Sequence, residues 1–221
     1  LASAAASPLA YYKFYAGEGG MRVPLIISGA SLPTKDVLSH AFSYVTDITL
    51  TILSLVGVAP PGERYAGRPV EPMIGRDLSP LLLNEAERVY RPEHAVGYEL
   101  AGHAALFQGD YKIVFNRSPL GDDQWRLFNI VEDPGESHDL SGEMPQRLQQ
   151  MLSAYEHYVR DNKVLPIPPG YDHRKQLVLN TLHAGLRTPF VVLLLSVLVT
   201  LPFYVAYRTK RASQRKFGGL S

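Results

Sequence analysis

Cysteine is absent from this chain, and neither sign of charge dominates it. Without cysteine, the sequence contains no disulfide, no zinc–thiolate site and no cysteine nucleophile. The formal net charge of +1 over 221 residues gives no indication of a nucleic-acid partner. An initiator methionine and a signal-peptide pattern are also absent from the start, where small and polar residues predict a chain entered in its middle.

Charge and glycine are concentrated between residues 13 and 24. Lys13, Glu18 and Arg22 lie around the pair Gly19-Gly20. Two consecutive glycines allow positive φ angles and close approach of the backbone to a ligand, and the lysine and arginine beside them would bind an oxyanion well. The alternative is a surface turn with solvated charges, because glycine pairs usually mark turns. Either way, the sequence predicts an exposed turn.

Two apolar segments follow this turn. The run at residues 25–27 is short and continuous, which predicts a strand buried on both faces. Residues 41–48 begin with the alternation of a strand, and a core helix is then predicted to end near Gly57, with Asp47 as its N-cap. The helical stripe that favours this core helix consists of Ile48, Ile52, Leu55 and Val56.

From residue 95 the pattern changes to strands. The alternation predicts four antiparallel strands, with Gly109-Asp110 as the turn of a hairpin. A helix is predicted after Pro145, and its apolar stripe would cover the sheet. The expected strands are residues 96–100, 104–108, 111–115 and 124–130, and the stripe is Leu148, Met151, Leu152, Tyr155 and Val159. The product is a compact α+β layer, and three of its histidines are expected to be exposed surface residues: His94, His103 and His138.

One long run near the C-terminus contains no charged residue. It begins at Thr188 and ends at Tyr207, and at about 1.5 Å per residue it spans roughly 30 Å, the thickness of bilayer hydrocarbon. We expect a transmembrane helix over residues 188–207, with a buried core helix as the alternative. A proline-rich linker, expected to be extended in its first part, precedes it at residues 165–187.

The tail after this run, residues 208–221, is basic. By the positive-inside rule it should lie in the cytoplasm, so the domains before the helix would face a lumen, the periplasm or the exterior. Asn116 begins an Asn-Arg-Ser sequon, which makes it a candidate glycosylation site if that side is a eukaryotic secretory lumen.

Several of these segments resemble the sulfatases of the alkaline phosphatase superfamily. The Lys-x4-Glu-Gly-Gly-x-Arg-x-Pro stretch from Lys13 is similar to a sulfatase signature, and Gly-Arg-Asp-Leu-Ser-Pro-Leu-Leu from Gly75 is similar to a later segment. The segments Gly-Asp-Tyr-Lys-Ile-Val, Trp-Arg-Leu-Phe-Asn and Glu-Asp-Pro-Gly-Glu-Ser-His-Asp-Leu resemble the C-terminal subdomain, most closely that of bacterial-type arylsulfatases. The ordered matches run from about residue 7 to residue 164.

The resemblance implies an α/β fold, the C-terminal portion of an alkaline phosphatase-like sulfatase. Residues 1–92 would belong to the catalytic domain, and residues 93–164 would form the four-stranded antiparallel subdomain. In the family, the lysine at the position of Lys13 contacts the sulfate ester, while the loop at Glu18, Gly19, Gly20 and Arg22 is mainly architectural. The implied substrate is a small-molecule sulfate ester, and the membrane is the other expected partner.

The implied reaction is hydrolysis of sulfate monoesters by a formylglycine hydrate, assisted by Ca²⁺ or a similar divalent cation. The family's Cys/Ser-x-Pro-x-Arg nucleophile motif and its paired aspartate ligands are not in this sequence. We therefore expect no metal ligand within this chain, and we expect the 221 residues alone to be inactive. Two alternatives stay open: a hydrolase of phosphonate monoesters or phosphodiesters from the same superfamily, and a non-catalytic membrane-tethered module.

Overall fold

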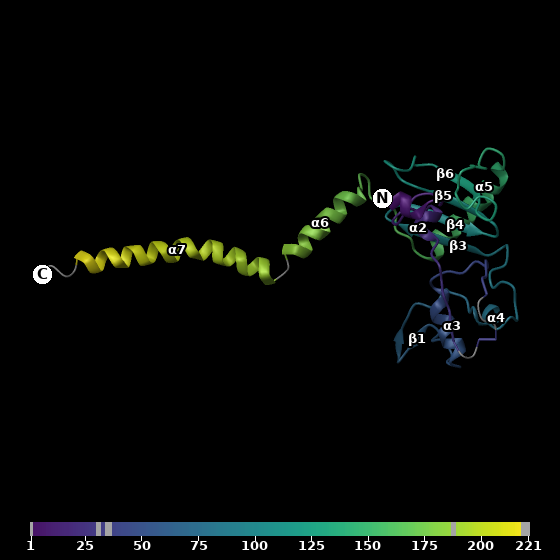
Figure 1. Ribbon diagram of the computed structural model, residues 1–221, viewed down its shortest axis with the longest axis horizontal. Coiled ribbons are helices and arrows are strands. Elements are labelled where there is room, and N and C mark those ends of the chain that lie inside the picture. Colours follow the sequence, from purple (N-terminus) through teal and green to yellow (C-terminus); the bar gives the residue numbers. More distant parts are fainter. Residues whose placement is uncertain (1, 30–31, 34–36, 187–188, 218–221) are drawn as a thin grey trace. The chain divides into compact units, whose positions relative to one another are not determined.

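The computed structural model describes residues 2–29, 32–33, 37–186 and 189–217 (Figure 1). The chain divides into two compact units, Leu1–Leu165 and Pro166–Ser221. Thr188, the first residue of the expected transmembrane segment, lies outside the described residues, as do the last residues of the expected tail, 218–221.

The first unit contains a four-stranded antiparallel sheet, whose strands lie together with α2 and α5 in Figure 1. Its strands pair in chain order: β3 (Ala95–Leu100), β4 (His103–Gln108), β5 (Tyr111–Phe115) and β6 (Trp125–Asn129). Gly109 and Asp110 make the turn between β4 and β5, and Gly109 has a φ of +62°, which glycine adopts without steric cost. The structure confirms the predicted four-stranded antiparallel sheet and its hairpin turn.

The helix α5 (Pro145–Asp161) covers one face of this sheet. Met151 is fully buried on that face and packs against Leu106, Ile113 and Leu127 of the three strands β4 to β6. Fully burying an apolar side chain of this size stabilises a fold by about 1.5–3 kcal/mol, so these four residues hold the helix to the sheet. The predicted amphipathic helix is confirmed.

The other face of the sheet packs against the N-terminal segment of the chain. Because side chains alternate along a strand, Phe107, Val114 and Phe128 point away from α5. They form a second buried cluster together with Ala16 and Ile130. The short helices α1 (Ala2–Ala6) and α2 (Glu18–Met21) belong to this N-terminal segment. The sheet is therefore covered on both faces, which places polar side chains as well as apolar ones in its interior.

The helix α3 (Asp47–Leu55) lies in the remaining part of the first unit, together with α4 (Ser79–Leu82) and the hairpin of β1 (Arg64–Tyr65) and β2 (Arg68–Pro69). The prediction of a core helix is wrong for this chain. The apolar stripe is exposed, with Ile52 at 55% exposure, and the buried residues of the helix are Asp47 and Thr51. No described segment covers the stripe. The predicted end of the helix is confirmed by Gly57, whose φ is +68°.

The apolar run at residues 25–27 does not form a strand, contrary to the prediction. Ile26 is 89% exposed, and the described residues include no strand that pairs with this run. A short apolar run becomes a buried strand only where neighbouring strands accept its backbone hydrogen bonds. The alternating residues 41–48 likewise form no strand, and the helix α3 begins within them.

The described residues of the second unit form two helices. The helix α6 (His173–Leu186) occupies most of the predicted linker, residues 165–187, whose first part is the part expected to be extended. The carboxylate of Asp172 accepts hydrogen bonds from the backbone N–H groups of Arg174 and Lys175, so it caps the start of this helix. The helix α7 (Pro189–Phe217) follows and continues through Pro202. Its residues Val191–Arg211 are long and apolar enough to cross a membrane.

Candidate functional site

The glycine-rich stretch that follows Lys13 is the centre of the candidate site. Lys13 itself is exposed and forms no hydrogen bond or ion pair with another residue in the described part of the chain. The predicted exposed turn is wrong for the residues after it, because Tyr15, Ala16 and Glu18 are buried. Phe14 has a φ of +94°, a rare conformation for a bulky residue. The chain therefore passes from an exposed lysine into the interior within a few residues.

The glycines of this loop lie where the backbone is too crowded for any side chain. A Cβ atom added at Gly19 would lie 2.5 Å from the carbonyl oxygen of Tyr11, and one added at Gly20 would lie 2.2 Å from the carbonyl oxygen of Tyr15. Both distances are far below a normal contact, and the obstructing atoms belong to the backbone. Only glycine fits at either position in this conformation.

Glu18 joins a buried group of charges. The Nζ atom of Lys112 donates hydrogen bonds to Oε1 of Glu18 at 2.9 Å and to Oε1 of Glu136 at 2.8 Å. All three side chains are almost fully buried, and Lys112 also lies over the ring of Phe107. Burial raises the pKa of Glu136 above its usual value, while the charge of Lys112 acts in the opposite direction.

Arg22 completes this group of charges. Its Nε atom donates to Oε2 of Glu18 at 2.6 Å, and its guanidinium also donates to the carbonyl oxygen of Ile130 at 3.3 Å. Arg22 and Lys112 supply two positive charges to this group, and Glu18 and Glu136 supply two negative charges. These contacts tie two of the five donors of Arg22 into the protein, whereas the ammonium of Lys13 has no partner in the described part of the chain.

Comparison with known proteins adds a relative and a fold. No family model matches the chain. The chain is 29% identical over 170 residues to an uncharacterized sulfatase of Schizosaccharomyces pombe, a match that covers 77% of this chain and 30% of the relative. The crystal structure of Ps i-CgsB in complex with k-i-k-neocarrahexaose aligns with a TM-score of 0.59 at 22% identity, covering 82% of this chain and 38% of that one. This chain has the fold of the C-terminal part of a sulfatase.

A further solved structure has a lower similarity to this sulfatase-like chain. The structure of BT4656 in complex with its substrate D-glucosamine-2-N,6-O-disulfate has a TM-score of 0.37 and 21% identity, and it covers 52% of this chain and 24% of that one. The chain thus spans less than two fifths of the length of the curated relative and of each of the two solved structures.

The sulfatase-like chain keeps Asn116, the candidate glycosylation site, in its interior. Its side chain is 4% exposed, and its Oδ1 atom accepts a hydrogen bond from the backbone N–H of Ala16 at 2.8 Å. A glycan on this amide would need the room that the N-terminal segment occupies. Asn116 is thus one of the residues that hold the loop.

The three histidines differ in burial. His103 was expected to be exposed, but it is fully buried, because its strand lies in the covered sheet and its ring packs on Tyr15 with the ring centres 4.7 Å apart. His94 is partly buried and its Nδ1 atom accepts the backbone N–H of Arg91. His138 is exposed and pairs with Glu143. None of these contacts joins a histidine to Lys13.

Asp47 does not act as the N-cap of α3, although the sequence predicts it. Thr46 precedes the helix, and the buried carboxylate of Asp47 accepts hydrogen bonds from the backbone N–H groups of Tyr44 and Arg76 and from the hydroxyl of Tyr90. The hydroxyl lies 2.6 Å from Oδ1. Asp47 therefore ties three separate segments together.

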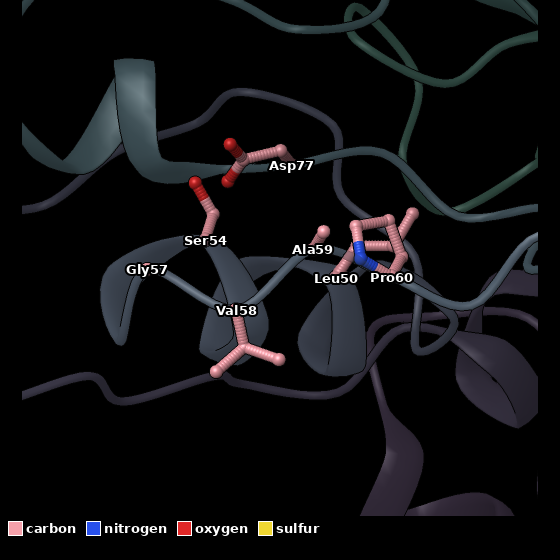
Figure 2. A pocket seen from close by; sticks show the side chains of 7 residues that line it. All are labelled: Leu50, Ser54, Gly57, Val58, Ala59, Pro60 and Asp77. Atoms are coloured by element: carbon pink, nitrogen blue, oxygen red, sulfur yellow. The ribbon is translucent and has the colours of Figure 1, made fainter.

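A pocket beside α3 offers little to a sulfate ester. Figure 2 shows its seven lining side chains, in which the Ser54 hydroxyl and the Asp77 carboxylate are the charged or polar side-chain groups. Burial acts to raise the pKa of Asp77, but hydrogen bonds from Ser54 and Ser79 outweigh it and hold the pKa below its usual value. An anionic wall without a cation repels an anionic substrate.

The described residues of this sulfatase-like chain also include no group of three or more histidine, aspartate or glutamate side chains that could hold a metal ion. The acidic side chains near the loop, Glu18 and Glu136, are already paired with Lys112 and Arg22. The residues present do not fit a divalent-cation site.

Sequence reasoning missed Lys112, Glu136 and Asn116 as the partners of the loop. Lys112 carried a signal that could have revealed one of them. It stands in a strand where the period-two pattern gives it the same face as buried neighbours, and a lysine in such a place needs acidic partners. Asn116 and Glu136 follow the ends of strands, and no local pattern indicates what they contact.

Proposed function

We propose that this chain is the C-terminal part of a sulfatase that hydrolyses sulfate monoesters, and that Lys13 contacts the sulfate group. The observation that carries the proposal is the loop after Lys13. Its backbone is held by crowded glycines and by the buried Glu18, while the Lys13 ammonium remains exposed and unpaired within the described structure. The fold and the sulfatase relative support the same reading.

Lys13 would act through its charge. An ammonium is a compact cation with three donors, and it can stabilise the negative charge that a sulfate ester develops on its oxygens in the transition state. Arg22 would serve mainly to hold the loop, because its Nε atom and one of its terminal nitrogens donate to Glu18 and to the carbonyl of Ile130. Glu18, Gly19, Gly20 and Arg22 would shape the loop.

The nucleophile and the cation would come from outside these residues. Sulfatases use formylglycine and a divalent cation, which supply the attacking oxygen and polarise the ester. The sequence contains no Cys/Ser-x-Pro-x-Arg motif, and the described residues do not fit a cation site. We therefore expect residues 1–221 alone to be inactive and the complete enzyme to require calcium or a similar ion.

The helix α7 would anchor the protein to a membrane. Its stretch Val191–Arg211 has the length and composition of a membrane span, and basic residues follow its apolar part: Arg208, Lys210 and Arg211. Basic flanks favour the cytoplasmic side. The sulfatase part would then face a lumen, the periplasm or the exterior.

The substrate class can be tested with the protein that the complete gene encodes. The purified protein is given an aryl sulfate, an aryl phosphonate monoester and an aryl phosphodiester at equal concentrations, and release of the phenol is measured. We expect the sulfate ester to have the highest kcat/KM. Faster hydrolysis of the phosphonate or the diester would assign the protein to the other hydrolases of the superfamily, and a folded protein that cleaves none of them would be a non-catalytic module.

A further inference from the structure

We propose that Lys112, Glu136 and Asn116 form a clamp that positions Lys13 for the reaction. The clamp consists of these three side chains, which all come from the four-stranded subdomain and all bind the loop after Lys13. They are positioning residues, because they contact the loop and not the substrate. The proposal rests on the proposed function of Lys13.

The clamp holds the loop at three points. Asn116 accepts the backbone N–H of Ala16 at 2.8 Å, and Glu136 accepts the backbone N–H of Glu18 at 2.9 Å. Lys112 then binds the side chains of Glu18 and Glu136 together. The loop backbone is thus fixed by side chains of distant segments, with sequence separations of 100 and 118 residues for the two backbone contacts.

The three clamp residues lie in or next to segments of the subdomain that are held by hydrogen bonds. Lys112 lies within β5, which pairs on both edges, and Asn116 follows the last residue of that strand. Glu136 lies in the turn after β6, where the carboxylate of Asp133 accepts the backbone N–H groups of Ser137 and His138. The clamp can therefore fix the loop, which has no strand of its own, at a defined place relative to the sheet.

A role in stability alone explains this arrangement poorly. Burying an ion pair costs desolvation free energy that its attraction roughly offsets, so apolar side chains of the same volume would stabilise the fold as well or better. Buried charges with several partners instead fix one geometry, because each hydrogen bond has a required direction. The clamp therefore fixes the position of the loop, in addition to filling the interior.

Lys13 is so close to the clamped loop in sequence that the position of the loop affects the position of Lys13. It lies three residues before Ala16, and a residue spans at most about 3.6 Å, so the two Cα atoms are within about 11 Å. Phe14, between them, has a positive φ, a rare conformation for a bulky residue. A displacement of about 1 Å in a group that contacts the reacting atoms can lower a rate about a hundredfold.

The test substitutes Glu136→Gln in the protein that the complete gene encodes. The amide keeps the size of the side chain, but it cannot accept from both Lys112 and the Glu18 N–H, because one of its two atoms is a donor. The matched control is Glu132→Gln, the same change on an exposed side chain in the preceding turn. We expect Glu136→Gln to lower kcat/KM for an aryl sulfate at least tenfold, mainly through kcat, and Glu132→Gln to leave it unchanged.

A double-mutant cycle with Lys13→Ala separates positioning from general damage. If Glu136 acts through Lys13, adding Glu136→Gln to Lys13→Ala lowers kcat/KM by less than threefold more. Losses that multiply would overturn the clamp and leave the role of Lys13 intact. An unchanged kcat/KM in Lys13→Ala would instead overturn the proposed function itself, so the two failures are distinguishable.

Amide hydrogen exchange gives a readout that does not depend on activity. In Glu136→Gln we expect exchange at the Glu18 amide to rise at least tenfold, while the amides of β4 and β5 keep their rates. Equal acceleration across the sheet would mean that the residue serves global stability only. If Glu136→Gln does not fold, Asn116→Ala removes one clamp contact without changing a charge, and the same kinetic and exchange results are expected at Ala16.

Discussion

At the residue scale, polar side chains join segments that lie far apart in the sequence. Asp47 binds Tyr44, Arg76 and Tyr90, and Lys112 binds Glu18 and Glu136. Each contact satisfies a buried polar group that would otherwise cost about 1–3 kcal/mol. These contacts fix how the loops lie on the apolar cores.

Asp139 is a residue of this kind at the edge of the subdomain. Its Oδ1 atom accepts the backbone N–H groups of Leu127 and Ser141, and its Oδ2 atom pairs with Arg126 at 3.1 Å. Burial acts to raise the pKa of Asp139, but the hydrogen bonds from Ser141 and Leu127 outweigh it and lower the pKa below its usual value. The folded protein therefore favours the ionised form more than the unfolded chain does.

The pKa of Asp139 predicts a pH-dependent effect of Asp139→Asn. A carboxyl group whose pKa is depressed by folding stabilises the protein above its unfolded pKa of about 3.9, and this stabilisation is lost as the pH falls through the lower folded value. We expect Asp139→Asn to lower the free energy of unfolding at pH 7 by about 1 kcal/mol and by less at pH 3. Urea unfolding at both pH values measures this.

The control for this prediction is Asp161→Asn, at the exposed C-terminal end of α5. It should change stability little at pH 7. A loss of stability in Asp139→Asn that is the same at pH 3 and pH 7 would show that the charge of Asp139 contributes nothing.

At the element scale, two helices with similar apolar stripes have opposite surroundings. The stripe of α5 covers the sheet, while the stripe of α3 is exposed and the polar residues Asp47 and Thr51 are buried. A stripe at helical spacing predicts that a helix has an apolar face, and it does not predict what covers that face. The same reason explains the exposed run at residues 25–27.

The elements that the sequence predicted correctly depend on local contacts. The strands β3 to β6 pair with their neighbours in the chain, and the turn at Gly109 needs only two residues. The helix α6 was missed because Pro166, Pro168 and Pro169 drew attention to an extended linker, although Asp172 caps a proline-free run directly after them. In this segment the cap residue Asp172 predicts the start of a helix better than the proline content does.

The helix α7 leads to a prediction about membranes. Removing residues 188–221 deletes every part of this helix, and the truncated protein should stay in the supernatant after membranes are washed with alkaline carbonate. The matched control removes residues 212–221 and keeps the candidate span Val191–Arg211. Sedimentation of the fully truncated protein with washed membranes would show that α7 is not the anchor.

At the scale of the whole molecule, the two units have different proposed tasks. The unit Leu1–Leu165 contains the sulfatase-like sheet and the Lys13 loop, and the unit Pro166–Ser221 contains the candidate membrane helix. The chain spans 30% of its sulfatase relative, and its residues include neither a nucleophile motif nor a described cation site. The proposed activity is therefore that of a complete sulfatase. This chain would contribute the contact of Lys13 with the sulfate group.

The sequence pattern indicates the proposed sulfate contact of Lys13, but it does not indicate which residues hold the Lys13 loop. The spacing from Lys13 to Gly20 is a local pattern, and its resemblance to a sulfatase signature can be seen without a structure. Lys112 lies 94 positions after its loop partner Glu18, and Asn116 lies 100 positions after its partner Ala16. No pattern in the sequence links either residue to the loop. Contacts between distant segments depend on the packed fold.

The most direct test of the account is the effect of Lys13→Ala on sulfate-ester hydrolysis by the complete protein. The control is Lys175→Ala, which removes an exposed lysine within α6. We expect Lys13→Ala to lower kcat/KM for an aryl sulfate at least tenfold, or about 1.4 kcal/mol of transition-state stabilisation, and Lys175→Ala to leave it unchanged. Equal kcat/KM values for the protein and its Lys13→Ala variant would contradict the account.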